Sequence, residues 1–286
     1  MKKKLRDKIR PVLQGKVPLE LLEKVPSRYQ RVGDIILLRL PEELLPYKHE
    51  VGAALLEVFP NVKTVLRYVR GISGELRLPS VEIIAGEQKT ETTHKENNCL
   101  YKLDVAKVMF SRDNKKERAR IPALVKDGEI VVDMFAGIGY FTIPIARLAN
   151  PKKIYAIELN PISVRYLKEN LILNHIEARV EVIEGDCRKI APKLGPIADR
   201  VIMGYFPQTY EFLPFALKVL KPTGGIIHYH DIFKKEELFE KPISILKKIS
   251  KENGYHLKKV LYTGIVKSYA PKTYHIVVDA FFESVK

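Results

Sequence analysis

Short apolar segments recur at regular intervals between residues 129 and 229, and this alternation restricts the fold more than any other feature of the chain. Each segment is rich in valine or isoleucine, is bounded by turn residues and is separated from the next by a helical pattern; the segments are 129–135, 153–157, 179–183, 199–203 and 225–229. Such strands, alternating with helices, are typical of a parallel sheet covered on both faces. We therefore expect an α/β domain.

Two further signals refine this sheet. Asn160 is suited to cap a helix that begins at Pro161, directly after the second segment. Residues 256–266 and 274–282 are both rich in strand-forming residues, and no helical pattern lies between them. They predict a hairpin, which would add an antiparallel strand to the parallel sheet near the C-terminus.

The first hundred residues show a less regular mixture of strand and helix patterns. We expect short strands and one helix there: strands at 34–40, 64–69 and 81–85, and a helix at 49–59. The segment 86–98 is polar and almost without aliphatic side chains, so we interpret it as a connection. The chain is thus expected to contain a smaller N-terminal α/β domain, residues 1–100, and a second domain, residues 101–286.

The charge of the chain is strongly basic. Its 49 lysines and arginines exceed its 34 acidic residues, giving a net charge of +15. The excess is concentrated in residues 1–31, with ten basic and three acidic residues, and in residues 107–126, with seven and two. This distribution favours a polyanionic partner such as a nucleic acid. A basic surface that only maintains solubility, or a composition typical of thermophiles, remains an alternative at this point.

Other features limit the cellular context. No stretch approaches the roughly 18 uninterrupted apolar residues of a membrane span, and no apolar signal-peptide core follows the basic N-terminus. Cys99 and Cys187 are the two cysteines, which suits a reducing compartment, although one disulfide stays possible. Neither cysteine nor histidine occurs in metal-ligand spacing. We expect a cytoplasmic protein without a metal or a membrane anchor.

A nucleotide-like ligand is predicted at the first strand of the second domain. That strand runs into a turn containing Gly137 and Gly139, which is followed by a helix. A glycine turn at a helix N-terminus lets the backbone approach a ligand closely. Glu158 ends the next strand, 21 residues beyond Gly137, where an acid can bind ribose hydroxyls. Asp186 follows the third strand and is suited to an adenine amine.

The ligand type follows from what the motif contains and lacks. Thr142 stands where a dinucleotide motif prefers glycine or alanine, and the Gly-Lys-Ser/Thr of a phosphate-binding loop is missing. Two acids without a phosphate-binding lysine indicate a nucleoside that carries no phosphate. S-adenosylmethionine fits this description; a dehydrogenase, or an α/β domain that has lost its ligand, remain alternatives.

These segments resemble a known family. Residues 133–141 (DMFAGIGYF), 158–161 (ELNP), 184–186 (EGD) and the final hairpin are similar to the class I methyltransferase fold. More narrowly, they resemble the archaeal and eukaryotic family that modifies the purine 3′ of the tRNA anticodon. One branch comprises tRNA guanine-N1 methyltransferases, and the other comprises wybutosine-synthesising aminocarboxypropyl transferases that act on 4-demethylwyosine. The resemblance covers residues 100–286 well and the first hundred residues loosely.

The residues after the fourth strand favour the second branch. The methyltransferases typically have Asn-Leu-Pro there, whereas this chain has residues 203–207 (MGYFP) followed by Thr209, and residues 224–230 (GGIIHYH) on the fifth strand. The resemblance therefore implies transfer of the 3-amino-3-carboxypropyl group of S-adenosylmethionine to carbon 7 of 4-demethylwyosine in tRNA(Phe). A guanine-N1 methyltransferase and a non-catalytic RNA-binding protein of the same fold remain alternatives.

The resemblance also implies which residues form the site. The expected contacts to S-adenosylmethionine are Ser111, Arg118, Asp133, Gly137, Glu158, Asp186 and Cys187. In this assignment Arg118 is suited to the methionine carboxylate or a tRNA phosphate, and Cys187 contributes its backbone and is not a nucleophile. Candidates for the catalytic group near the base are Tyr205, His228 and His230. The N-terminal domain is expected to contact tRNA, and the protein to be a monomer.

Overall fold

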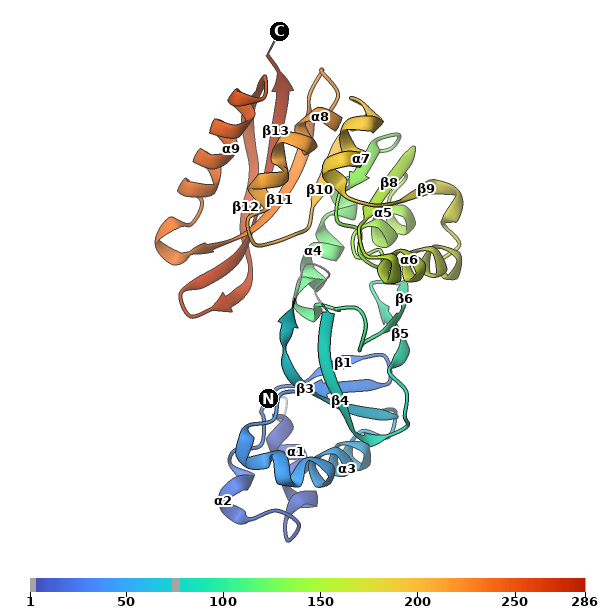
Figure 1. Cartoon of the computed structure of the whole chain (residues 1–286), viewed down its shortest axis with the longest axis vertical. Helices are drawn as coiled ribbons and strands as arrows, with labels where there is room; N and C mark the ends of the chain where they lie inside the picture. The colour runs from blue at the N-terminus through green and yellow to red at the C-terminus, as the bar shows by residue number, and fades with distance from the viewer. Residues whose placement is uncertain (1–3, 74–77, 286) are drawn as a thin grey trace. The chain divides into compact units, whose positions relative to one another are not determined.

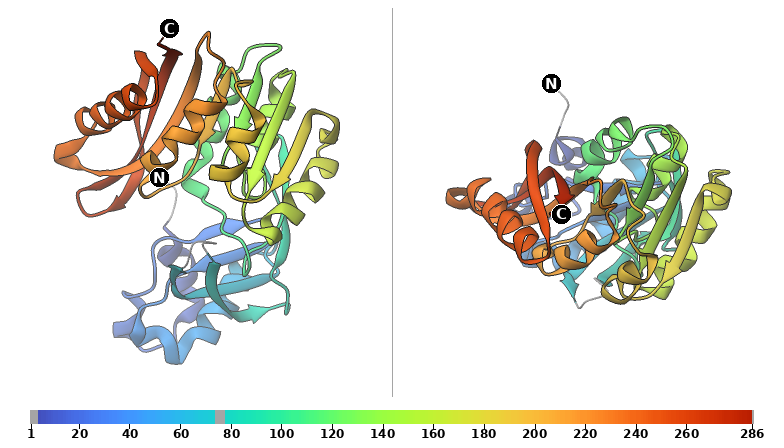
Figure 2. Two further views of the ribbon diagram at one scale, coloured as in Figure 1. Left: turned by 45° about the horizontal axis from the view of Figure 1, so that its top comes forward. Right: turned by 90° about the horizontal axis from the view of Figure 1, so that it is seen from above.

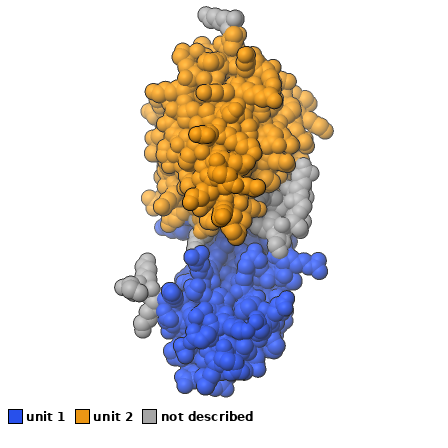
Figure 3. Space-filling view, turned by 90° about the vertical axis from the view of Figure 1, so that its left-hand side faces the viewer, with its two compact units in different colours: residues 1–96, 100–112 blue, residues 97–99, 113–286 orange. Residues whose placement is uncertain are grey.

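The computed structural model describes residues 4–73 and 78–285, and its chain forms two compact units (Figure 1). Unit 1 comprises Met1–Glu96 and Leu100–Arg112, and unit 2 comprises Asn97–Cys99 and Asp113–Lys286, coloured separately in Figure 3. The contacts therefore place Leu100–Arg112 with the N-terminal unit, whereas the sequence pattern places the division at residue 100.

Unit 1 contains a four-stranded sheet in the order β1-β2-β3-β4. Its strands are β1 (Gln30–Val32), β2 (Ile35–Leu38), β3 (Thr64–Ser73) and β4 (Leu78–Gly86), and β2 and β3 are parallel. Its helices are α1 (Leu5–Leu13), α2 (Leu19–Leu22), η1 (Glu42–Tyr47) and α3 (Lys48–Val58). Leu5, Ile9 and Leu13 form the buried side of α1 and pack in one apolar cluster with Val51 and Leu55 of α3.

The polar segment 86–98 is not a simple connection, which corrects the interpretation from sequence. It contributes strand β5 (Glu91–Glu96), which pairs with β6 (Cys99–Asp104) in a two-stranded sheet. Thr92 and Glu96 of β5 are buried although both are polar, and the Thr92 hydroxyl donates a 2.5 Å hydrogen bond to Asp34. Because these buried positions are not aliphatic, an apolar pattern could not reveal the strand.

Unit 2 is built on a seven-stranded sheet in the order β12-β13-β11-β10-β7-β8-β9. Its strands are β7 (Ile130–Asp133), β8 (Lys153–Glu158), β9 (Val180–Glu184), β10 (Arg200–Met203), β11 (Gly225–Lys234), β12 (Tyr255–Ala270) and β13 (Thr273–Ser284). The strands from β11 to β9 are parallel, and β13 is antiparallel to both β11 and β12. The predicted parallel sheet with an antiparallel C-terminal strand is confirmed.

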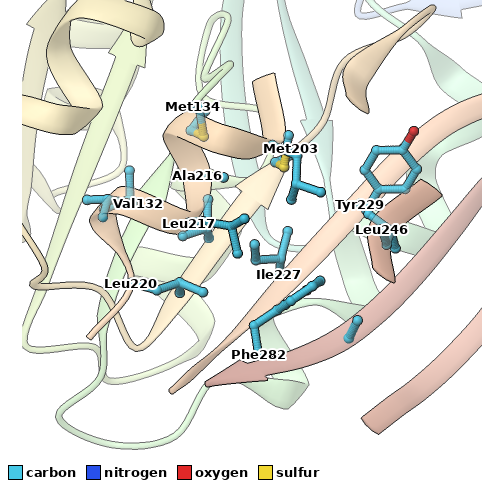
Figure 4. Packing of buried hydrophobic residues seen from close by; sticks show 14 of the residues in the cluster. Val132, Met134, Met203, Ala216, Leu217, Leu220, Ile227, Tyr229, Leu246 and Phe282 are labelled. Carbon is cyan, nitrogen blue, oxygen red and sulfur yellow. The ribbon is translucent and has the colours of Figure 1, made fainter. Parts of the chain in front are cut away.

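Helices cover both faces of this sheet (Figure 2). One face packs against α7 (Cys187–Leu194), α8 (Leu213–Val219) and α9 (Glu240–Glu252); Figure 4 shows Leu217 and Leu220 beside Ile227 of β11. The opposite face lies against α5 (Thr142–Leu148) and α6 (Pro161–Leu173), since Asp133 on that face contacts Thr142. The short elements η2 (Arg112–Asn114), α4 (Lys115–Arg120), η3 (Pro122–Leu124), η4 (Glu177–Arg179), η5 (Thr209–Phe212) and η6 (Lys235–Glu237) lie in the connections.

The start of α6 agrees with its sequence signals. The Asn160 side chain accepts a 2.9 Å hydrogen bond from the backbone nitrogen of Ile162, and Pro161 occupies the first helical position. This cap fixes the end of the loop that begins at Glu158, so it also fixes part of the predicted ligand site. None of the helices in residues 4–73 and 78–285 is long and apolar enough to cross a membrane.

Candidate active site

The predicted ligand residues that end or follow strands β7, β8 and β9 lie at the carboxyl edge of the sheet of unit 2: Asp133, Gly137, Glu158, Asp186 and Cys187. The order of strands reverses between β7 and β10: the chain proceeds from β7 outward to β8 and β9, and then returns to β10 on the other side. In open α/β sheets, such a switch point leaves a crevice between the loops that diverge from it. The loops after β7, β8, β9 and β10 therefore form the candidate site.

The glycine turn after β7 requires glycine at position 137. Gly137 has a φ of 56°, and a Cβ atom there would come within 2.3 Å of the Tyr140 ring. Its backbone nitrogen donates a 2.7 Å hydrogen bond to Oε2 of Glu158. The turn and the carboxylate predicted to bind the ribose are thus directly connected.

Glu158 holds the loops after β7 and β8 together. Its other oxygen, Oε1, accepts a 2.8 Å hydrogen bond from the backbone nitrogen of Asn160. Burial raises the pKa of this carboxyl, and the backbone donors oppose that shift. Each carboxylate oxygen has capacity for another donor. The side chain can therefore accept from vicinal hydroxyls while it keeps the two loops in place.

Asp133 lies beneath the turn and supports it. Its side chain is fully buried; it accepts a 2.8 Å hydrogen bond from the Thr142 hydroxyl and a 3.3 Å bond from the backbone nitrogen of Phe135. Burial raises the pKa of Asp133 to about 7, although these two donors act in the opposite direction. Thr142, which in the sequence only argued against a dinucleotide motif, thus anchors the start of α5 to β7.

Asp186 and Cys187 lie at the start of α7. The Asp186 carboxylate caps the helix by accepting from the backbone nitrogen of Arg188, and it forms a 2.7 Å ion pair with the Arg188 side chain. The arginine lowers the pKa of Asp186, so this carboxyl is ionised at neutral pH. Burial raises the pKa of the Cys187 thiol to about 12. A thiol in this state is a poor nucleophile.

Two of the predicted contacts precede β7. Arg118 lies on α4 in unit 2, and only 1% of its surface is exposed. Ser111 belongs to unit 1, so the structure does not relate its position to the glycine turn. Arg120, on the same short helix as Arg118, donates two hydrogen bonds to Asp279 of β13 and pairs with Glu117. The helix that carries Arg118 is therefore fixed to the sheet.

Tyr205 lies in the loop after β10. Its ring stacks on that of Phe135 with the centroids 4.9 Å apart, and Phe212 packs edge-on against both. Gly204 permits this arrangement, since a Cβ atom there would lie 2.8 Å from the Phe141 ring. The loops after β7 and β10 thus meet through aromatic side chains at the switch point.

Asp231 organises the same loop, although no sequence motif pointed to it. Its carboxylate accepts 3.0 Å hydrogen bonds from the backbone nitrogens of Gln208 and Thr209 and a 2.6 Å bond from the Tyr229 hydroxyl. The Thr209 hydroxyl in turn donates to the carbonyl of Tyr205. The sequence around Asp231 does not indicate this role, because the backbone nitrogen of Thr209 that it accepts from lies 22 residues earlier in the chain. The two residues are brought together only by the fold.

His228 is fully engaged by protein groups. Its Nδ1 lies 2.6 Å from the Asp279 carboxylate, and its Nε2 lies 2.7 Å from the Arg200 guanidinium. Because a guanidinium only donates, Nε2 accepts and Nδ1 carries the proton. Burial lowers the pKa of His228. Arg200 also pairs with Glu129 at 2.7 Å. Glu129, Arg200, His228 and Asp279 therefore form one continuous polar network.

His230 differs from His228 in one respect. Its Nδ1 lies 3.1 Å from Nε2 of His275, but its Nε2 has no hydrogen-bond partner among the described residues. The ring lies 5.7 Å from that of Phe141, at the loop after β7. Burial lowers the pKa of His230 to about 3, so the imidazole is neutral at physiological pH.

This combination defines a class of protein. A sheet of this order with one inserted antiparallel strand, a glycine turn after β7 and an acid at the end of β8 form the nucleoside-binding fold of class I S-adenosylmethionine-dependent transferases. Within that class, the chain belongs to the TRM5/TYW2 family. Residues 92–258 match the family described as the TRM5/TYW2 methyltransferase domain, and residues 9–90 match the TYW2 N-terminal domain. The predicted family resemblance is confirmed.

Individual relatives match along nearly the whole chain. A Pyrococcus horikoshii protein named tRNA(Phe) (4-demethylwyosine(37)-C(7)) aminocarboxypropyltransferase is 43% identical, with 96% of each chain covered. The Pyrococcus abyssi tRNA (guanine(37)-N(1))-methyltransferase Trm5b is 38% identical over 92% of this chain and 77% of its own. The crystal structure of P. horikoshii TYW2 in complex with MeSAdo superposes with a TM-score of 0.85 at 41% identity, covering 99% of this chain and 100% of that one.

Proposed function

We propose that this protein is an S-adenosylmethionine-dependent tRNA 3-amino-3-carboxypropyl transferase that modifies carbon 7 of 4-demethylwyosine, beside the anticodon of tRNA(Phe). The main support is the 43% identity to the aminocarboxypropyltransferase, which extends over 96% of both chains. The methyltransferase Trm5b is less similar, and this chain spans only 77% of it. The Met203–Pro207 segment, which departs from the Asn-Leu-Pro of the methyltransferase branch, supports the same choice.

When bound, S-adenosylmethionine supplies the 3-amino-3-carboxypropyl group: its γ-carbon bonds to carbon 7 of the base, its bond to sulfur breaks, and methylthioadenosine leaves. Any of the three carbons on the sulfonium can be attacked, so the protein selects the product by positioning. The glycine turn, which has no room for a Cβ atom, and the Glu158 carboxylate suit the nucleoside. Asp186 and the backbone of Cys187 are assigned to the adenine.

The other half of the donor requires a cation for its carboxylate. We assign this role to Arg118, whose helix is fixed to β13 through Arg120 and Asp279. Ser111 is assigned a hydrogen bond to the same amino-acid tail. Asp133 has no direct role in this assignment, because its carboxyl is buried under the turn and engaged by Thr142 and Phe135.

A proton must leave carbon 7 after the new bond forms, and His230 is the proposed acceptor. Both ring nitrogens of His228 are hydrogen-bonded to protein groups, whereas Nε2 of His230 is not, within the part of the chain that the structure describes. If Nδ1 donates to His275, Nε2 carries the lone pair that accepts the proton. Tyr205 is assigned to packing against the substrate base, because its ring already stacks on Phe135.

The test uses tRNA(Phe) that carries 4-demethylwyosine and two batches of S-adenosylmethionine, labelled in the methyl carbon or in the carboxyl carbon. The proposal predicts that the carboxyl label enters the RNA and that methylthioadenosine accumulates. Entry of the methyl label alone contradicts the proposal and favours a methyltransferase. Calorimetry that detects no donor binding at millimolar concentration contradicts both enzyme assignments and favours a non-catalytic RNA-binding protein.

The remaining assignments concern the whole protein. We propose that the N-terminal hundred residues contact tRNA, since residues 1–31 carry ten basic and three acidic side chains. A cytoplasmic location and a monomeric state complete the proposal. Sedimentation of the purified protein tests the oligomeric state, and a stable dimer would contradict it. No group of three or more histidine, cysteine or acidic side chains that could hold a metal occurs within residues 4–73 and 78–285.

A further inference from the structure

Strand β12 exposes an unusual set of side chains for the edge of a sheet. Among the strands that the structure describes it pairs with β13 alone, and its exposed apolar residues include Tyr262 at 43% and Tyr269 at 54% of their surface. Long exposed edges with apolar side chains promote unwanted strand pairing. Four register shifts interrupt the pairing of β12 with β13, which makes the strand irregular. Tyr262 and Tyr269 are thus exposed on an irregular edge strand and do not belong to the buried core.

The charged residues of this strand and its turn are also all basic. Between residues 255 and 272 the sequence contains four lysines and no acidic residue. Lys267 places its Nζ 6.0 Å from the centroid of the Phe206 ring. The Arg120 guanidinium, which is engaged by Asp279 and Glu117, lies over the Tyr262 ring at 4.4 Å and holds that ring in place. Aromatic rings interleaved with cations are the features that bind single-stranded nucleic acid, because bases stack on the rings and phosphates pair with the cations.

The same strand is connected to the candidate active site. The Tyr269 ring packs edge-on against Phe206 at 5.8 Å, and Phe206 follows Tyr205 in the loop after β10. Phe206 also lies 4.4 Å from the His275 ring, whose Nε2 is the partner of His230. A continuous set of rings thus extends from the proposed proton acceptor to the outer edge of the sheet.

From these contacts we infer that Tyr262, Lys267 and Tyr269, here called the hairpin surface and backed by the buried ring of Phe206, bind unpaired nucleotides next to the target base. This inference rests on the proposed function and adds to it the surface that holds the RNA loop. The adenosine half of the donor is assigned to the loops after β7, β8 and β9. The hairpin surface flanks β11 on the opposite side of the switch point, so the RNA loop would approach from the side that the donor leaves open.

The test measures binding of an anticodon stem–loop RNA that carries 2-aminopurine beside the target position, with a fully paired RNA of equal length as competitor. Stacking on Tyr269 predicts fluorescence quenching on binding. Tyr269→Ala should lose the quenching and bind the loop RNA about tenfold more weakly. Tyr269→Phe, which keeps the ring, should retain both. Binding of the paired RNA should change less than twofold in either variant.

A charge control separates a specific contact from general attraction. Lys267→Ala should weaken loop binding severalfold, whereas Lys248→Ala, at an exposed position of α9, should not. Donor affinity, measured by calorimetry, should stay within twofold of wild type in every variant, which shows that the fold is retained. Unchanged quenching and affinity in Tyr269→Ala overturn the hairpin surface. Association of β12 between two copies, seen as a dimer that Tyr269→Ala abolishes, overturns it as well.

The failure of this inference can be told apart from failure of the proposed function. If the wild-type protein transfers the carboxyl label to RNA but Tyr269→Ala has the same KM for RNA, the hairpin surface alone is wrong. If the wild-type protein transfers no carboxyl label, the proposed function is wrong, and the quenching experiment then reports only whether this strand binds unpaired RNA.

Discussion

At the scale of single residues, two neighbouring carboxyl groups have different tasks because their surroundings differ. Asp133 is buried and supports the glycine turn through Thr142, whereas Glu158 is only partly buried and keeps capacity for a ligand. The sequence predicted both as contacts of the donor. It could not separate them, because the difference lies in which groups pack over each carboxyl once the strands are in place.

Glu158→Ala should weaken donor binding by at least tenfold and leave tRNA affinity within twofold of wild type. The reason is that the carboxylate is assigned to the ribose of the donor and not to the RNA. Calorimetry with S-adenosylmethionine and filter binding with tRNA measure the two affinities. A parallel loss of both affinities would show that Glu158 acts by holding the fold, since it also accepts from Gly137 and Asn160.

Asp133 predicts a dependence of stability on pH. Its folded pKa of about 7 lies above the ordinary value of 3.8, so the folded state holds its proton more tightly than the unfolded state. The contribution of Asp133 to the free energy of unfolding is therefore fully present below pH 4 and is lost as the pH rises towards 7. Asp133→Asn removes this loss, so its stability relative to wild type should rise by about 3–4 kcal/mol as the pH increases from 4 to 7. Urea unfolding at several pH values measures it; a pH-independent difference would contradict the assignment.

At the scale of elements, the strands were predictable and their polar links were not. Ile154 and Ile157 of β8 and Val201 and Ile202 of β10 follow the apolar pattern, and all are buried. The contact between His228 and Asp279 joins residues 51 positions apart, and it exists only because β11 and β13 pair in this register. Local sequence patterns contain no information about such a pairing.

Arg120→Ala should destabilise unit 2 by about 3 kcal/mol, because it leaves the buried Asp279 carboxylate without its cation. This pair also fixes the helix of Arg118, so donor affinity should fall together with stability. The double variant Arg120→Ala with Asp279→Asn should recover part of the stability, since it removes the uncompensated charge. Chemical denaturation of the four proteins gives the coupling; strictly additive effects would argue against a direct interaction.

Asp231→Asn should lower the rate of transfer at least tenfold while donor affinity stays within twofold. An amide places a donor opposite the backbone nitrogens of Gln208 or Thr209, so the loop that carries Tyr205 loses its anchor. Single-turnover kinetics separates this effect from binding. A rise in the Kd for the donor with an unchanged rate would place Asp231 in the donor site instead.

At the scale of the whole molecule, the net charge of +15 acts as an attraction for RNA that salt weakens. Lys16→Ala combined with Arg28→Ala changes two exposed cations of unit 1. If unit 1 contacts tRNA phosphates, the slope of log affinity against log salt should decrease by about 1–2. Filter binding from low to moderate salt measures the slope, with Lys248→Ala as the control on α9. An unchanged slope would show that unit 1 does not contact the phosphates.

The position of β13 has a consequence for synthesis on the ribosome. β13 follows β12 in the chain but lies between β11 and β12 in the sheet, and it pairs with both. During vectorial translation, β12 therefore leaves the exit tunnel before β13, the strand that it pairs with. Until β13 emerges, a nascent chain displays β12 with Leu261 and Ile265 and no backbone partner. In ribosome-arrested chains that carry a C-terminal spacer of increasing length, chaperone binding should accordingly peak when the spacer is long enough to bring β12 out of the tunnel, and decline once it also brings out β13.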